Sequence, residues 1–267
     1  MTSTVVGGGG TVSISYVGDD LQPKIGFNPQ DRFMVALANT LVVVTSNGDV
    51  FGADIVNGRM QPVFQFTGAK IGFNPQDRFM VALGNALVAV TSNGDVLGAE
   101  VVGRHIGPVV PFTGAKIGFN PGYRFIAAMG NTIVVVTSIG DVYGADVVGH
   151  DILPVHEVTG AKIGFNPQDR FLMALGSRLV VVTNEGSVFA ADVVDVSGVR
   201  QDRKGVVLME RNVKPVVQLG GAKIGFNPGD RFMMTLGMSL VVVTTDGDAF
   251  GADVVAGGLG PPIQLNP

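Results

Sequence analysis

The sequence predicts an all-β protein, a five-bladed β-propeller with four antiparallel strands in each blade. The ten residues KIGFNPQDRF that begin at Lys24 recur, with at most two changes, at Lys70, Lys116, Lys162 and Lys223. Short runs rich in Val, Phe and Thr follow each copy, and turn residues separate them. No segment has apolar residues at helical spacing, so we expect strands throughout.

The spacing of the copies indicates how the chain is organised. Successive copies are 46, 46, 46 and 61 residues apart. A period of this size is typical of a solenoid, a propeller or an array, and four strands in each unit favour the propeller. A β-trefoil would need threefold repetition, and a parallel β-helix has a shorter coil. We therefore expect a single domain, 1–267, with units 24–69, 70–115, 116–161, 162–222 and 223–267.

The second unit shows the expected strands most clearly. They are RFMVALG, ALVAVTSNG, DVLGAEVVG and GPVVPFTG. Asn-Gly stands at 47–48 in the first unit and at 93–94 in the second. This pair is favoured in tight hairpins, where both central residues need positive φ. Each unit is therefore expected to form one antiparallel blade.

Composition excludes several classes of protein. Charged residues make up 15% of the chain, the formal net charge is −4, and ten of the 18 Lys and Arg belong to the repeated decapeptide. Basic charge is thus evenly spaced, which argues against a nucleic-acid partner. The longest apolar runs are too short for membrane insertion. The first residues lack the features of a signal peptide, so we expect a cytoplasmic protein or one released without such a peptide.

The chemistry of an enzyme is not recognisable in the sequence. There is no Cys, and the three His (105, 150 and 156) lie outside the decapeptide. No nucleophile motif, phosphate-binding loop or calcium-loop frame is present. We therefore expect no catalytic residues, no metal site and no cofactor.

The decapeptide combines residues that suit packing with residues that suit binding. Its two Phe are expected to pack between blades, and Asn-Pro is expected to form a turn. Its Arg recurs in every unit, as does an acidic residue further on: Asp54, Glu100, Asp146, Asp192 and Asp253. One interpretation is a structural bridge from Arg to a carboxylate or to carbonyls, and the other is a polar ligand site between blades.

The candidate ligand-binding residues are the polar members of the five decapeptide loops. They are Asn28, Gln30, Asp31, Arg32, Asn74, Gln76, Asp77, Arg78, Asn120, Tyr123, Arg124, Asn166, Gln168, Asp169, Arg170, Asn227, Asp230 and Arg231. The seventh and eighth positions of the motif vary, so the sites are expected to differ in affinity.

The order A-K-I-G-F-N-P-x-x-R-F, followed by L-V-V-V-T-x-x-G-D-V-F-G, resembles the repeat of tachylectin-type and tectonin-like propeller lectins. The resemblance covers residues 24–267. It implies a carbohydrate-binding propeller with glycan or glycoconjugate sites between blades, one in each repeat. Those lectins carry a Trp in the corresponding loop, whereas this chain has no Trp and places Asn-Pro there.

A second function class remains open beside the lectin. Unit four carries about fifteen extra residues, in a segment spanning 195–212, and insertions in repeat proteins are often functional. The chain could thus be a non-enzymatic scaffold that binds a protein partner through one propeller face or through this insertion.

The first 23 residues contain TVSISYV at 11–17, which reads as an additional strand. We expect this N-terminal closing segment, 1–23, to pair with the last unit, because a closed ring has no exposed strand edges. Deletion of residues 1–22 should therefore lower the melting temperature in a thermal scan, and an unchanged melting temperature would contradict this interpretation.

Overall fold

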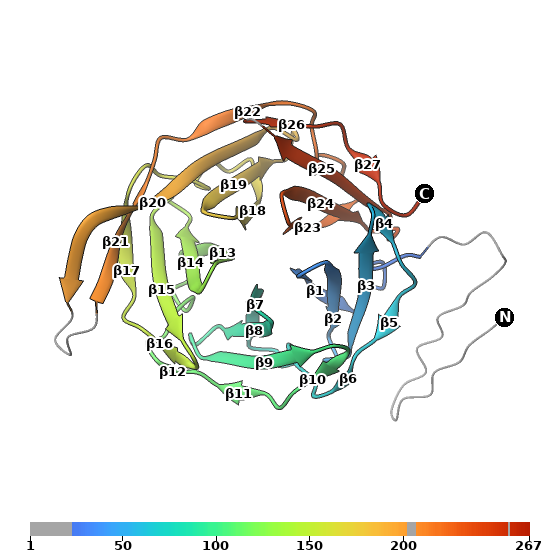
Figure 1. Ribbon diagram of the computed structural model, residues 1–267, viewed down its shortest axis with the longest axis horizontal. Helices are drawn as coiled ribbons and strands as arrows, with labels where there is room; N and C mark the ends of the chain where they lie inside the picture. Colours follow the sequence, from blue (N-terminus) through green and yellow to red (C-terminus); the bar gives the residue numbers. More distant parts are fainter. Residues whose placement is uncertain (1–22, 202–206, 256) are drawn as a thin grey trace.

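The structure, a computed structural model, describes residues 23–201, 207–255 and 257–267. These residues form strands, turns and bends, without a helix, arranged as a ring around a central axis (Figure 1). The predicted all-β propeller is confirmed. The expected strand at 11–17 lies outside the described residues.

Each repeat contributes three long antiparallel strands, beginning at the centre of the ring (Figure 1). The innermost strands are β1 (Asp31–Leu37), β7 (Asp77–Leu83), β13 (Tyr123–Met129), β18 (Asp169–Leu175) and β23 (Asp230–Leu236). The second strands are β2 (Thr40–Thr45), β8 (Ala86–Thr91), β14 (Thr132–Thr137), β19 (Arg178–Thr183) and β24 (Ser239–Thr244). The third strands are β3 (Val50–Val56), β9 (Val96–Val102), β15 (Val142–Val148), β20 (Val188–Gln201) and β25 (Ala249–Val255).

The outer strand of each unit is broken into two pieces that both pair with the third strand. The pieces are β4 (Arg59–Met60) and β5 (Phe64–Gln65), β10 (His105–Ile106) and β11 (Val110–Pro111), β16 (Asp151–Ile152) and β17 (His156–Gly160), β21 (Val207–Val213) and β22 (Val217–Gly221), and β26 (Gly258–Leu259) and β27 (Ile263–Gln264). A proline stands in each gap, at 62, 108, 154, 215 and 261. Because proline has no N–H to donate, the fourth strand is interrupted at this point.

The turn between the second and third strands differs from the predicted two-residue hairpin. In unit one it spans residues 46–49, and only Gly48 has positive φ, at 78°. The Thr45 side chain accepts a hydrogen bond from the Asp49 N–H at 3.1 Å and stabilises this longer turn. Asn47 therefore does not need the left-handed conformation that a two-residue Asn-Gly hairpin would impose.

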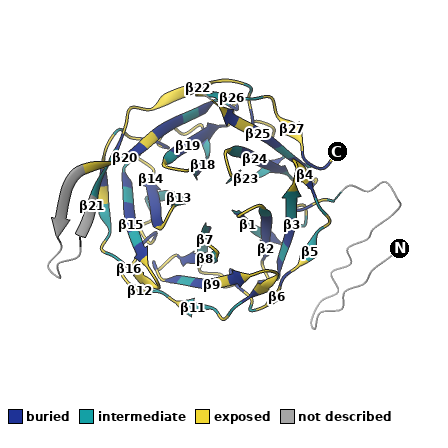
Figure 2. Cartoon of the chain, viewed as in Figure 1, coloured by how far each residue is buried: buried dark blue, intermediate teal, exposed yellow. Residues whose placement is uncertain are grey.

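The second strand of each unit is buried on both of its faces. In β2, Leu41 and Val43 pack against unit five, whereas Val42 and Val44 pack against unit two. All four side chains are at most 2% exposed. This arrangement explains why the strand is a continuous apolar run with no alternation of polar residues, and Figure 2 shows the same buried layer around the ring.

Neighbouring units also join at their outer strands. Short parallel ladders connect β6 (Thr67–Gly68) to β10, β12 (Thr113–Gly114) to β16, β17 to β21, and β22 to β26. The ring closes between the last and first units, where the Met60 N–H donates to the Leu265 carbonyl at 2.7 Å. The buried Asn266 accepts from the Ala249 N–H and donates to the carbonyls of Pro23 and Gly247.

The two faces of the ring carry different parts of each repeat. Asp31 pairs with Thr45 at one end of the first hairpin, and Leu37 pairs with Thr40 at the other end. We call the face that carries the decapeptide loops and the turns at 46–49 the motif face. The opposite face carries the turn at 38–39 and the end of β3. The unit-four insertion extends β20 and β21 into a hairpin that projects from the rim (Figure 1).

Candidate functional site

The decapeptide forms a compact loop that is held by its own side chains. In unit one, the Asn28 side-chain oxygen accepts from the Gln30 N–H at 3.0 Å. The Asp31 carboxylate in turn accepts from the Asn28 N–H at 2.9 Å. Units two and four repeat both bonds, unit three keeps the Asn bond and unit five keeps the Asp bond. The predicted Asn and Asp residues therefore shape the loop backbone, as turn-forming side chains do.

The Arg of each decapeptide reaches into the loop of the next unit. Arg32 donates through one terminal nitrogen to the carbonyls of Gly72 (3.2 Å) and Asn74 (2.7 Å), and through the other to the Asp77 carbonyl. The other four arginines bind equivalent carbonyls: Arg78 to unit three, Arg124 to unit four, Arg170 to unit five and Arg231 to unit one. The planar guanidinium also lies about 4.7–4.9 Å from the ring centre of the Phe that follows it in each unit.

The repeated acids do not meet these arginines, because they lie on the opposite face. Asp54 pairs with Thr40 in the sheet, at the far end of the strand from Arg32. Its carboxylate accepts from the Thr40 hydroxyl at 2.6 Å. Asp146 and Asp253 accept from Thr132 and Ser239 in the same way. The sequence left open whether the repeated Arg bridges to a carboxylate or to carbonyls. In the structure it bridges to carbonyls.

The carboxylates inside the loops are buried. Asp31, Asp77, Asp169 and Asp230 are between 3% and 8% exposed. Burial raises the pKa of each carboxyl above its ordinary value, although the backbone N–H of the loop Asn and the neighbouring guanidinium act in the opposite direction. One oxygen of Asp77, Oδ1, is buried without a hydrogen-bond partner. In unit three Tyr123 takes this position.

What the loops present to solvent is different from what the sequence suggested. The first Phe of each decapeptide was expected to pack between blades, yet its side chain is about half exposed. The exposed fractions are 48% for Phe27, 53% for Phe73, 50% for Phe119, 53% for Phe165 and 45% for Phe226. Each ring rests against the glycine of the preceding unit's turn, as Phe27 does against Gly247. Gln30 and Gln168 are also exposed.

An ion pair stands beside four of these rings and links adjacent units. The Lys of the decapeptide meets the Asp that ends the preceding unit's turn, in Lys24–Asp248 (3.2 Å), Lys70–Asp49 (2.8 Å), Lys116–Asp95 (2.7 Å) and Lys162–Asp141 (2.6 Å). In the fifth junction Ser187 replaces the Asp. The signal for these pairs was present in the sequence, since Lys and Gly-Asp recur with the same period.

The five units differ from one another on the motif face. In unit three, Tyr123 lies with its ring centre 6.4 Å from that of Phe119 and 6.1 Å from that of Tyr143. Ile139 occupies the turn position where units one and two have Asn, and it is 62% exposed.

A cavity of about 300 Å³ lies at the junction of units one and two, and it is lined by Asp49, Gln65, Thr67 and Lys70 among others.

The predicted site residues are therefore distributed around the ring, one loop in each unit. Each Arg contacts the backbone of the next unit's Asn and of its Asp, or of Tyr123 in unit three, and the loops are not brought together into one pocket. In the part of the chain that the structure describes, no group of three metal-ligating side chains is found. The described residues also contain no helix that is long and apolar enough to cross a membrane.

The strand order, the ring and the repeated joints define the class of this protein as a β-propeller. Neither the scan against protein-family models nor the search of curated proteins found a match. Solved structures with similar folds include human WBSCR16 (14% identity, 85% of this chain and 65% of that chain, TM-score 0.39). A second is yeast RCC1 (Prp20), solved with Kap60 bound, at 11% identity over 88% of this chain and 61% of that chain, with a TM-score of 0.38. A third is Kluyveromyces lactis Hsv2, at 13% identity over 89% of this chain and 74% of that chain, with a TM-score of 0.41. The chain spans less than two thirds of the first two, and at these identities the likeness concerns the fold alone.

The arginine that crosses the closing junction is open to a direct test. Arg231→Ala removes three hydrogen bonds from a charged donor to the carbonyls of Gly26, Asn28 and Asp31. The free energy of unfolding should fall by about 2–4 kcal/mol in urea denaturation, after allowing for partial exposure. Arg231→Lys should not restore it, since an ammonium lacks the planar fork. The exposed Arg59→Ala is the control, and an equal loss there would contradict the assigned role.

The buried loop carboxylates should give a distinct dependence on pH. Because burial raises the pKa of Asp230 in the folded state, the folded protein binds this proton more tightly than the unfolded chain does. The contribution of Asp230 to stability therefore falls as pH rises from 3.8 through its folded pKa. Asp230→Asn should gain stability relative to the parent chain between pH 4 and pH 7, measured by urea denaturation. The exposed Asp246→Asn is the control variant, and a fall in the relative stability of Asp230→Asn over this pH range would refute the mechanism.

Proposed function

We propose that this protein is a non-enzymatic scaffold that binds a protein partner through the motif face. The observation that carries this proposal is the ring of five half-exposed Phe side chains, Phe27, Phe73, Phe119, Phe165 and Phe226, at equivalent positions on one face. We call this set the phenylalanine ring. Exposed aromatic side chains that gather on one surface are typical of interaction sites, and aromatic residues carry much of the energy in protein interfaces.

The chemistry of the loops supports a surface for binding rather than for reaction. Their strongest polar groups, the guanidinium and the Asp carboxylate, are already bonded within the ring. The groups that remain accessible are the Phe rings, the exposed Gln side chains and the Lys–Asp pairs. An apolar centre beside partly exposed charges is the usual composition of a protein interface.

Repetition gives such a surface a further property. A partner with two or more suitable side chains can engage several units at once, and the second contact then forms at high effective concentration. Tyr123 and Ile139 enlarge the apolar surface at unit three. We therefore expect a protein partner to contact the motif face mainly at unit three.

Glycan binding is the second candidate, and one feature favours it. The cavity at the junction of units one and two places Asp49, Gln65, Thr67 and Lys70 together, and the Phe73 ring lies against Gly48 at its edge. Hydrogen-bonding groups beside an aromatic ring suit a sugar, and the resemblance to propeller lectins points in the same direction. Five weak sites would act together on a multivalent glycan.

The two candidates are separated by changing the phenylalanine ring. Substitution of all five Phe by Gln should reduce capture of protein partners by the immobilised full chain at least tenfold, quantified by mass spectrometry. The matched control replaces four exposed Val on the opposite face, Val56, Val102, Val148 and Val255, by Gln. Equal capture by the Phe variant and the parent chain would exclude the motif face.

A glycan array with the same three proteins completes the test. The scaffold predicts no specific glycan signal from the parent chain. A signal that disappears in the Phe variant and persists in the Val variant would instead establish the lectin.

A further inference from the structure

The opposite face carries one acid in every unit, and four of the five have a partner within the chain. Asp54, Asp146 and Asp253 accept from the hydroxyl of the second strand, as described above, and in unit four Arg178 donates to Asp192 at 2.7 Å. Unit two is different, because Ala86 takes the position of the hydroxyl. Within the described residues, the Glu100 side chain forms neither a hydrogen bond nor an ion pair.

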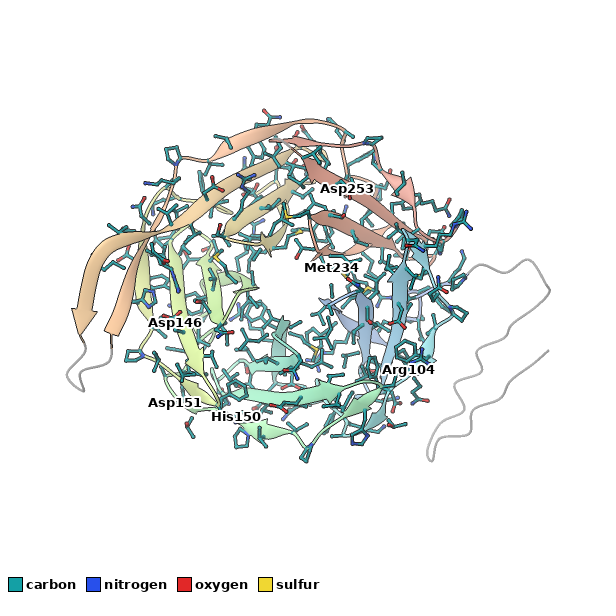
Figure 3. All side chains as sticks on the ribbon, viewed as in Figure 1. Arg104, Asp146, His150, Asp151, Met234 and Asp253 are labelled. Atoms are coloured by element: carbon teal, nitrogen blue, oxygen red, sulfur yellow. The ribbon has the colours of Figure 1, made fainter. Side chains whose placement is uncertain are left out.

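At two junctions an arginine from the next unit lies beside the acid. Arg104 of unit two, labelled in Figure 3, lies at the junction with unit one. It stacks on Phe64 of unit one, with its guanidinium carbon 3.8 Å from the ring centre, and one of its nitrogens lies 3.6 Å from Asp54. Arg211 of unit four donates to Asp146 and to Thr132 of unit three, both at 2.8 Å. Burial of the Asp146 carboxyl acts to raise its pKa, but the hydrogen bonds from Thr132 and Arg211 together outweigh burial and hold the pKa below its ordinary value. The fold thus holds a guanidinium at this position twice.

The junction of units two and three also has an acid at this position, Glu100, but the next unit has no arginine beside it. His150 occupies the position of Arg104 and packs edge-on against Phe112, with ring centres 5.1 Å apart. A cavity of about 190 Å³ opens here, and its lining includes Glu100, Phe112, His150, Asn85 and Asn131. It has room for several water molecules, each of which takes about 30 Å³ in the liquid.

We propose that this cavity binds the guanidinium group of a ligand. Glu100 supplies the carboxylate that Asp54 and Asp146 supply elsewhere, and Phe112 supplies an aromatic wall, at a different position from Phe64. A guanidinium is recognised by such a pair because its planar fork binds a carboxylate while its face stacks on a ring. The group could belong to an arginine side chain of a protein or to a free guanidinium compound. The site lies on the face opposite the phenylalanine ring, so it is independent of the function proposed above.

The test is an NMR titration of the full chain with the peptide acetyl-Gly-Arg-Gly-amide. Saturable shifts of the amides at 84–86 and 149–150 are expected with this peptide, and none with the citrulline peptide, which has the same shape without the charge. Glu100→Gln should weaken binding at least tenfold. His150→Arg should abolish it, because the new guanidinium would lie beside Glu100 as Arg104 lies beside Asp54 and Arg211 beside Asp146. Glu157→Gln, an exposed glutamate outside the cavity, is the matched control.

Three results would overturn the proposal: no saturable shift with the arginine peptide, equal binding of the citrulline peptide, or unchanged binding by Glu100→Gln. Agmatine distinguishes the two sources of the guanidinium. Binding of agmatine as tight as that of the peptide supports a free compound, and tighter binding of the peptide supports a protein side chain.

Discussion

The ring depends on one interaction, the forked donation from an arginine of one unit to the loop carbonyls of the next. For Arg32 to meet the Gly72, Asn74 and Asp77 carbonyls, the loop must turn all three toward the same point. Gly72 contributes positive φ, and a Cβ there would come within 2.5 Å of Met80. The Asn and Asp side chains fix the rest of the loop. The same residues that resemble a binding motif are thus the parts of a joint.

This joint also explains the buried charge in each loop. The carboxylate of Asp31 is removed from water at 7% exposure, which is unfavourable for its ionised form. The Asn28 N–H and the guanidinium of Arg231 both favour ionisation, and burial remains the stronger influence. Unit three avoids the charge altogether by using Tyr123, whose backbone carbonyl still accepts from Arg78 at 2.5 Å. The arginine binds main-chain oxygens, so the side chain at this position can change while the joint persists.

Sequence repetition was sufficient to predict the all-β propeller and the positions of the three long strands of each unit, because every unit must fit similar neighbours. It was insufficient for the fourth strand, since the effect of Pro62 and its equivalents on pairing depends on which edge the strand presents. It also misplaced the first Phe. The period shows that Phe27 recurs, but it does not show that the ring rests on Gly247 of another unit with about half of its side chain exposed.

The sequence also predicted only part of the candidate site. The loop residues were identified, yet their partners are backbone atoms about 40–60 residues away, or about 200 residues away at the closing junction, which no local pattern encodes. Glu100, which has no side-chain partner among the described residues, departs from the symmetry of the repeats. It becomes meaningful only when the contacts of Asp54 and Asp146 are known, because a missing partner cannot be seen from spacing alone.

Each arginine donates in one direction only, from a unit to its successor, and the last unit donates to the first. These arginine contacts are therefore the same at every junction of the ring and do not distinguish a first unit from a last one. A circularly permuted chain, opened between any two units and joined through its present ends, would retain all five arginine forks. Such permutants would differ chiefly at Asn266, which binds the carbonyls of Pro23 and Gly247 and marks where the present chain ends.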